Sequence, residues 1–464
     1  MTHSDDFGAE AMPAGGGTSP PVASHVRAQV WDEAACRTVH AATLRVLERT
    51  GVEVHHERAQ EVFAAAGARV AGTRVRIGRD LVERAIATVP RDAELRARGG
   101  RPSVTLRPGA GLYGTGPDCL YVLDPDLHQR RRARLHDVAA AAALCDQLPN
   151  IDFVMSMALP EDVPRGEEDL AQFGAMLGAT TKPIIMSTPR EGERLREMYA
   201  MAAAAGDPGS FAVLTMSSPP LKHDREAIDK LLVCAELGIP LVLAPAAACG
   251  TTAPASVTAA VVVCNAEVLS GLVLHQLVRP GAPFVYGVGV GAMNMQTAVD
   301  AYCAPEAFLG NQATSDLARF YGLPMWHYAA CSDAKLADGQ LAAEYALSTV
   351  LGALAGATLL HDVGYLESGL QSSLEGIVLG DELIGWTRAF LRELAVDDEA
   401  LALGEIEAVG PGGDHLARSY TRAHFRRFWR PGVIDQSVYD RWRAAGATTL
   451  EERVRARLAN LRGA

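Results

Sequence analysis

The 464-residue chain lacks several features that would place it in a common protein class. Its eight cysteines form no C-x-x-C pair, so neither a zinc ribbon nor a disulfide framework is indicated, and we expect a reduced, cytoplasmic setting. No uninterrupted apolar run reaches the roughly 18 residues that a membrane span needs. The nearest candidate, residues 257–278, carries Asn265, Glu267 and His275, which predicts a buried helix instead.

The chain also lacks an excess of positive charge. It has 43 basic and 55 acidic residues, for a net charge of −12, which argues against a protein that binds nucleic acid by neutralising phosphates. Residues 1–25 contain no apolar core of the kind found in signal peptides and are rich in Gly, Pro and Ala. We predict that they form a disordered leader.

Familiar catalytic and metal-binding motifs are missing as well. There is no G-x-S-x-G elbow, no Ser-His-Asp order and no dinucleotide fingerprint. Paired carboxylates of the kind that glycosidases use are not evident, because Asp362 stands nearly alone among the strand ends. Isolated Cys or His residues at strand ends are more often packed than metal-ligating, so we predict no metal site from Cys249, Cys331, His327 and His361.

A regular alternation of apolar runs and helical stretches fills the middle of the chain. The strand-like runs are residues 151–158, 182–188, 211–218, 240–247, 284–289, 324–330 and 358–364. An eighth strand can be drawn from residues 112–115 or 120–123, followed by an Ala-rich helix at 136–147. The helical stretches between strands are residues 165–178, 190–204, 223–237, 254–278, 303–321, 338–355 and 374–394. Short, continuously apolar strands alternating with helices predict an α/β fold with a (β/α)₈ TIM-type barrel over residues 111–400, in preference to a doubly wound open sheet.

The segments on either side of the predicted barrel lack its regular alternation of strands and helices. Residues 26–110 show mainly helical spacing with a few short strands, and we predict a helical N-terminal region. Within residues 101–134 the D-P-D-L-H turn predicts a β-hairpin insertion. Residues 401–464 combine a Gly-rich turn with basic helices and predict a helical C-terminal extension.

The predicted strand ends form the rim of the barrel, where chemistry collects in this fold. Three strands end in the same dipeptide, at Met155–Ser156, Met186–Ser187 and Met216–Ser217. Methionines give a soft apolar pocket wall, although packing explains them equally well. Lys and Arg are almost absent from the strand ends, which disfavours a phosphorylated substrate.

Residues 322–345 carry the most informative pattern. Three consecutive rings precede four acidic or polar side chains: Trp326, His327 and Tyr328, then Asp333, Asp338, Gln340 and Glu344. Ring faces attract an organic cation and a carboxylate balances its charge, so this pattern favours a methylated ammonium ligand. The alternative is that the rings fill the core and the carboxylates begin a solvated helix.

Long blocks of the chain resemble the corrinoid-dependent trimethylamine methyltransferase family over residues 30–460. The blocks are YVLDPDLHQRRRARLHDVAAAAALCDQLPNIDFV (121–154), TTKPIIMS (180–187), NAEVLSGLVLHQLVRPGAPFVYG (265–287), DAKLADGQLAAEYALSTVLGALAGATLLHDVG (333–364), SLEGIVLGDELIG (373–385) and VGPGGDHLARSYTRAHFR (409–426). The resemblance implies a (β/α)₈ barrel that moves a methyl group from an amine to the Co(I) of a corrinoid, or cobalamin, on a separate protein. We also expect a homo-oligomer.

One departure from the family pattern narrows the expected substrate. Archaeal trimethylamine enzymes hold a pyrrolysine, whereas this chain contains only the standard twenty residues. The chain therefore resembles the non-pyrrolysine branch, whose members act on quaternary amines such as glycine betaine. A quaternary amine leaves as a neutral tertiary amine once a methyl group is removed, so no proton has to be supplied.

The resemblance and the ring pattern together give a set of candidate site residues, with no catalytic residue assigned. Candidates for substrate contact are Trp326, Tyr328 and Tyr286 as ring faces, His327 and Tyr113 as second choices, Asp333 or Asp362 as counter-charge, and Gln340, Glu344 and His361 as hydrogen-bonding groups. Candidates for contact with the corrinoid are Gly250, Gly287, Gly289 and Gly412. Two other functions stay open: a sensor that only binds methylated amines, and a methylcorrinoid:pterin methyltransferase.

Overall fold

Seven parallel strands form the centre of the molecule. The computed structural model describes residues 26–187 and 191–463, so the predicted leader at 1–25 lies outside the described residues. The strand order is β6-β18-β17-β14-β12-β10-β9. The bounds are β6 (Leu112–Thr115), β9 (Ile184–Met186), β10 (Phe211–Thr215), β12 (Leu241–Leu243), β14 (Phe284–Gly287), β17 (Met325–Tyr328) and β18 (Leu359–Val363).

An eighth, very short strand closes the sheet into a barrel. Phe153 forms a parallel bridge with Gly114 of β6, and Val154 forms one with Ile184 of β9. Beyond them, Thr115 Oγ1 accepts the Met155 N–H at 2.7 Å and replaces the next ladder bond. The predicted (β/α)₈ fold is confirmed, and its first strand is residues 112–115 and not 120–123.

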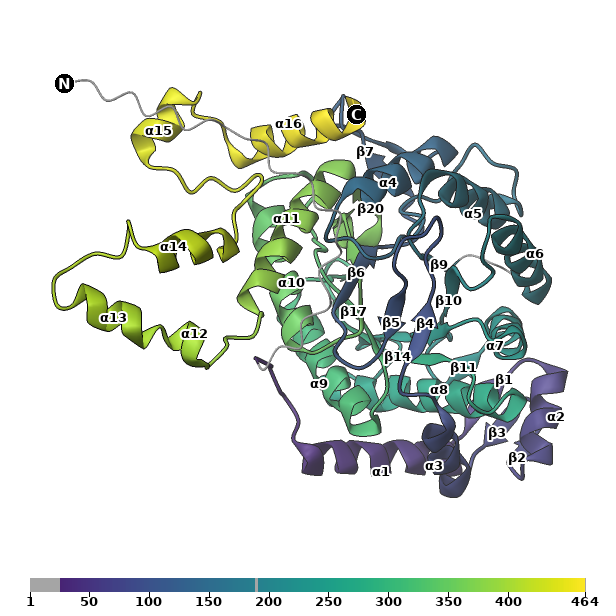
Figure 1. The fold of residues 1–464 in the computed structure, drawn as a ribbon. Coiled ribbons are helices and arrows are strands. Elements are labelled where there is room, and N and C mark those ends of the chain that lie inside the picture. The colour runs from purple at the N-terminus through teal and green to yellow at the C-terminus, as the bar shows by residue number, and fades with distance from the viewer. Residues whose placement is uncertain (1–25, 188–190, 464) are drawn as a thin grey trace, which may run out of the picture.

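A helix follows each barrel strand, and together the helices form the outer ring seen in Figure 1. Their bounds are α4 (Leu135–Gln147), α5 (Glu168–Ala179), α6 (Gly192–Ala204), α7 (Arg225–Leu237), α8 (Val257–Val278), α9 (Pro305–Tyr321), α10 (Gly339–Leu354) and α11 (Leu374–Phe390). Among the described helices, only α8 is long and apolar enough to cross a membrane, and most of it is buried inside the protein. The prediction of a buried helix there is confirmed.

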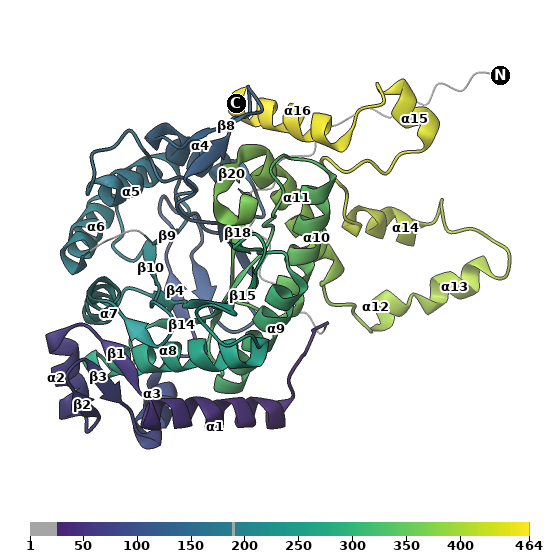
Figure 2. The ribbon, with the colours of Figure 1, turned by 180° about the vertical axis from the view of Figure 1, so that it is seen from behind.

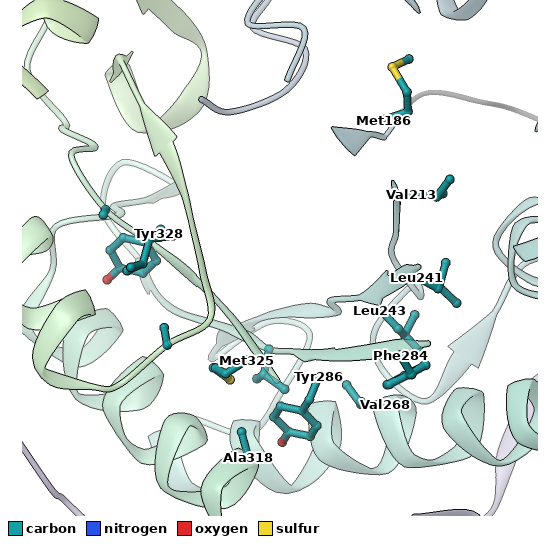
Figure 3. Packing of buried hydrophobic residues seen from close by; sticks show 14 of the residues in the cluster. Met186, Val213, Leu241, Leu243, Val268, Phe284, Tyr286, Ala318, Met325 and Tyr328 are labelled. Atoms are coloured by element: carbon teal, nitrogen blue, oxygen red, sulfur yellow. The ribbon is translucent and has the colours of Figure 1, made fainter. Parts of the chain in front are cut away.

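The strands separate two apolar layers because successive side chains point to opposite faces. Inside the barrel, Phe153, Val242 and Trp326 pack with Leu95 and Leu106. The last two come from a hairpin of β4 (Ala93–Leu95) and β5 (Val104–Leu106) that covers the amino-terminal end of the barrel. The second layer lies between strands and helices. Figure 3 shows part of it, with Tyr286 lying against Ala318 of α9.

Smaller sheets surround the barrel. Before it lie α1 (Glu33–Arg49), β1 (Val52–Val54), α2 (Glu57–Ala65), β2 (Arg69–Ala71), β3 (Arg74–Arg76) and α3 (Arg79–Thr88), with β11 (Lys222–His223) completing the sheet β11-β1-β3-β2. The predicted hairpin is confirmed as β7 (Tyr121–Leu123) and β8 (Arg130–Arg132), joined by β20 (Gln371–Ser373) and β19 (Tyr365–Leu366), with the short 3-10 helix η1 (Glu367–Gly369) between β19 and β20. At the carboxyl end of the barrel, β13 (Ala246–Cys249), β15 (Gly289–Asn294) and β16 (Val299–Asp300) form a rim sheet.

The C-terminal segment is helical and extends away from the barrel. It contains α12 (Asp398–Leu401), α13 (Leu403–Val409), α14 (Ser419–His424), the 3-10 helix η2 (Phe425–Arg427), α15 (Tyr439–Ala444) and α16 (Leu450–Gly463). Figure 2 shows α12, α13 and α14 standing apart from the barrel, while α16 lies beside α11. Several large apolar side chains in this segment are exposed: Leu394, Val396, Leu403, Ile406 and Leu416.

Candidate functional site

A cavity of about 180 Å³ opens at the carboxyl ends of the barrel strands. A cavity of this size accommodates a small organic molecule. The walls come from the ends of β10, β12, β14, β17 and β18 and from the rim sheet. The lining includes four aromatic residues, two carboxylates, two imidazoles and one amide: Trp326, Tyr328, Tyr302, Tyr365, Asp300, Asp362, His327, His361 and Asn311.

Trp326 forms part of the floor of this cavity. Its ring stacks on the His361 ring with centroids 4.1 Å apart and planes 15° apart, and Phe153 lies on it at 6.1 Å. His361 Nδ1 in turn lies 2.5 Å from Asp362 Oδ1. Trp326 therefore supports a ring and, through it, a carboxylate.

Two tyrosines line the cavity beside the floor. The Tyr328 and Tyr302 rings lie 6.5 Å apart, and the Tyr328 hydroxyl donates to the Tyr302 carbonyl at 3.2 Å. The Tyr302 loop is fixed by Asp333, whose two oxygens accept the N–H groups of Tyr302 and Cys303 at 3.0 Å each. Asp333 was expected to balance the ligand charge, but the structure places it behind the loop, where it positions Tyr302.

His327 is neutral at neutral pH. Its Nδ1 donates to the Tyr328 carbonyl at 2.7 Å, and burial lowers the pKa of its imidazole to about 4. The remaining nitrogen, Nε2, is buried and has no hydrogen-bond partner among the described residues. An imidazole in this state is an acceptor at Nε2 and does not supply protons near pH 7.

Asp300 is the carboxylate of the rim sheet. Its Oδ1 is buried without a hydrogen-bond partner in the described part of the chain. Burial raises the pKa of this carboxyl, and the nearby charge of Asp333 raises it further. Glycine is required opposite it, because a Cβ on Gly291 would lie 1.9 Å from Asp300 Oδ1.

The repeated Met-Ser strand ends have a structural explanation. Ser156 donates to Asp118 at 2.8 Å, and Ser187 donates to the other oxygen of the same half-buried carboxylate. Ser217 donates to the buried Glu267, which also accepts the Leu221 N–H at 2.7 Å. Burial raises the pKa of Glu267 to about 7. The three serines thus tie the loops after their strands to the carboxylates of Asp118 and Glu267.

Several predicted contact residues lie outside the cavity. Tyr286 points outward from β14 and donates to Asn265 Oδ1 of α8 at 3.0 Å. Tyr113 is buried at 2% exposure with the Arg388 guanidinium 5.2 Å from its ring. Gln340 is exposed and donates to Glu344 at 3.0 Å. Neither tyrosine can reach a ligand in the cavity, because each faces the helix layer.

Glu344 also acts on the loop behind the cavity. It accepts the Ser332 hydroxyl at 2.5 Å and the Asp333 N–H at 2.8 Å. Together with Cys303 and Asp333 it forms a group whose potential ligand atoms lie within 4.8 Å of one another. The two carboxylates already accept loop N–H and hydroxyl groups, so this cluster is explained by loop anchoring.

The four glycines expected at the corrinoid have different surroundings. Gly289 lines the cavity. Gly250 adopts φ +93° in the loop after β13, and Gly412 adopts φ +78° in the exposed C-terminal extension. Gly287 is needed for packing, because a Cβ there would lie 2.6 Å from the Cβ of Ala244.

Replacing Gly287 by alanine is expected to lower the free energy of unfolding by about 1–3 kcal/mol, because the new methyl group overlaps Ala244 on the neighbouring strand. Urea unfolding measures the loss. Gly178→Ala is the control, since nothing lies within 4 Å of the added Cβ in α5, and it should be neutral or stabilising. Equal stability of the two variants would contradict the packing explanation.

The cavity also contains residues that the sequence did not single out. Asp300 comes from β16 of the rim sheet, Tyr302 from the turn that follows β16, Asn311 from α9 and Tyr365 from β19. They lie beyond the barrel strands, so a search of strand ends misses them. The signal that could have found Asp300 and Tyr302 is the Gly-rich extension of β14, which continues the strand past the barrel.

Comparison with known proteins agrees with the geometry. The trimethylamine methyltransferase (MTTB) family model matches residues 9–462. The chain is 30% identical over 416 residues to the glycine betaine methyltransferase of Desulfitobacterium hafniense, covering 87% of this chain and 86% of that protein. It is 30% identical over 435 residues to the trimethylamine methyltransferase MttB of Methanosarcina thermophila, covering 89% and 88%.

A solved structure supports the fold. The monomethylamine methyltransferase MtmB of Methanosarcina barkeri superposes with a TM-score of 0.54 at 12% identity, covering 93% of this chain and 88% of that one. At this identity the likeness concerns the fold alone. The long family match and the 30% identity to two relatives decide the assignment: the chain belongs to the trimethylamine methyltransferase (MTTB) family and is a methyltransferase.

Proposed function

We propose that this protein transfers a methyl group from a quaternary amine to the Co(I) corrinoid of a separate corrinoid protein. The observation that carries the proposal is the composition of the cavity. Aromatic rings and two carboxylates line it, and none of its described lining residues is a lysine or an arginine. Such a cavity suits an organic cation.

The chemistry explains why no general acid is needed. The corrinoid supplies a cobalt nucleophile that takes the methyl group, while the C–N bond breaks with its electron pair remaining on nitrogen. The leaving group is then a neutral tertiary amine, which needs no proton. His327 fits this requirement, because burial keeps its pKa at about 4 and its imidazole neutral.

The residues of the chain have to bind, orient and desolvate the amine. The rings of Trp326, Tyr302 and Tyr328 contact the methyl groups, and Asp300 and Asp362 balance the charge. The carboxyl end of the barrel stays open to the approach of a second protein, with Met216 half exposed at its edge. Holding the methyl carbon in line with the acceptor supplies the rate enhancement through positioning.

A turnover assay tests the proposal. The full chain is incubated with reduced free cobalamin and a panel of methylated amines, and methyl transfer is followed by the absorbance change of the cobalamin. We expect turnover with at least one quaternary amine and none with trimethylamine. Absence of turnover with every amine would overturn the proposal, and binding without turnover would favour the sensor alternative.

A further inference from the structure

The two carboxylates of the cavity, Asp300 and Asp362, each lie close to a glycine. Asp300 Oδ1 would lie 1.9 Å from a Cβ on Gly291. A Cβ on Gly116 would lie 2.3 Å from the Tyr365 ring and 2.5 Å from Asp362 Oδ1. Asp362 itself adopts φ +74°, in the left-handed region that is unfavourable for residues other than glycine. The glycine at position 291 therefore leaves room for the Asp300 carboxylate, and the glycine at position 116 leaves room for both Tyr365 and Asp362.

The charge of these carboxylates is only partly balanced inside the protein. Asp362 Oδ1 accepts from His361 Nδ1, and a doubly protonated His361 would neutralise that one carboxylate. Asp300 has no counter-ion among the described residues, and its Oδ1 is buried without a partner. His327, with its lowered pKa, adds no positive charge. The cavity is thus left with a net negative charge, which a bound cation balances.

A second charge on the ligand changes this balance. Asp300 and Asp362 line the same cavity, so the carboxylate of a bound betaine would share that cavity with two like-charged groups. Within the described lining, Asn311 is the one side-chain amide and no guanidinium or ammonium group receives an anion. A buried carboxylate without a positive partner is strongly disfavoured, and like charges add to the cost.

We propose that this cavity selects quaternary ammonium compounds whose fourth substituent is uncharged, such as an alkyl or hydroxyalkyl group, and discriminates against betaines. Asp300 is the specificity-determining residue and Gly291 makes room for it. The inference rests on the proposed function, because it narrows the substrate class of the same site.

Choline and glycine betaine form a matched pair for the test. Both carry a trimethylammonium group, and they differ by a hydroxymethyl group in place of a carboxylate. Titration calorimetry with the full chain should show choline, and tetramethylammonium as a tail-free probe, binding at least tenfold more tightly than glycine betaine. Asp300→Asn should weaken choline binding and reduce the choline-to-betaine ratio at least threefold.

A control variant separates the site from the overall charge. Asp398→Asn makes the same charge change at an exposed position in α12 and should leave the ratio unchanged. Betaine binding as tightly as choline to the unmodified chain would overturn the selectivity and leave the proposed function standing. Failure of all three ligands to bind would also overturn the selectivity, while the turnover assay with the full amine panel decides the proposed function separately. The comparison of ligands on the unmodified chain does not depend on whether Asp300→Asn folds.

Discussion

Replacing Trp326 by leucine is expected to weaken the binding of a quaternary amine by roughly 30- to 100-fold. The indole supplies a ring face to the cation, worth up to about 2 kcal/mol in a desolvated site. It also stacks on His361, which holds Asp362, and an aromatic pair adds about 0.5–1.5 kcal/mol. Losing the ring therefore removes a direct contact and loosens a carboxylate. Titration calorimetry with the best-binding amine measures the effect.

Two variants control for the loss of a buried ring. Trp326→Phe keeps an aromatic face and should lose less affinity than the leucine variant. Phe284→Leu removes a buried ring from the layer between strands and helices, outside the cavity, and should bind the amine as the unmodified chain does. Unchanged affinity in Trp326→Leu would remove Trp326 from the binding site.

Replacing His275 by leucine is expected to make the protein more resistant to acid. His275 is fully buried in α8, packs on Phe284 at 5.5 Å, and burial lowers its pKa from 6.5 to about 3. Between pH 6.5 and about 3, His275 is protonated in the unfolded chain and neutral in the folded chain. The free energy of unfolding therefore falls as the pH decreases. By pH 4 this costs about 3 kcal/mol. The leucine variant has no imidazole to protonate at this position, so it should not show this loss of stability.

Urea unfolding at pH 7, 5 and 4 measures the difference between the variant and the unmodified chain. His223 and His327 have pKa values lowered by burial to about 4, so both also destabilise the fold in acid. Glu267, with its pKa raised to about 7, acts in the opposite direction between pH 7 and 4.5. These three groups are present in both proteins, so their effects cancel in the difference in free energy of unfolding between the variant and the unmodified chain. His415→Leu changes an exposed histidine and should leave the loss of stability between pH 7 and pH 4 unchanged. An equal gain in acid stability in His415→Leu would refute the explanation.

The barrel could be read from the sequence because its signals are local. Each helix alternates with a short apolar strand, and the observed helices fall within a few residues of the expected ranges. The strand at 151–158 was the least accurate, since only Phe153 and Val154 pair and the side chain of Thr115 completes the edge.

The candidate site was predicted in part. The order of rings in β17 correctly indicated a strand end, and Trp326, His327, Tyr328, His361 and Asp362 all line one cavity. The acidic run from Asp333 to Glu344 lies behind the Tyr302 loop instead. Local sequence does not reveal which carboxylate faces a ligand and which anchors a loop, because both patterns use the same residues. The roles of these side chains in binding, and the expected homo-oligomer, stay predictions.

The sequence by itself determined the alternation of strands and helices, the burial of α8 and the family. These follow from residue periodicity and from long matching blocks, which do not depend on distant contacts. Only the tertiary structure decided which side chains meet. Pairing of β17 with β18 brings His361 onto Trp326, and the rim sheet places Asp300 beside the same cavity, although the three lie far apart in the chain. Such meetings depend on strand register and on the direction of each side chain, which no single segment encodes.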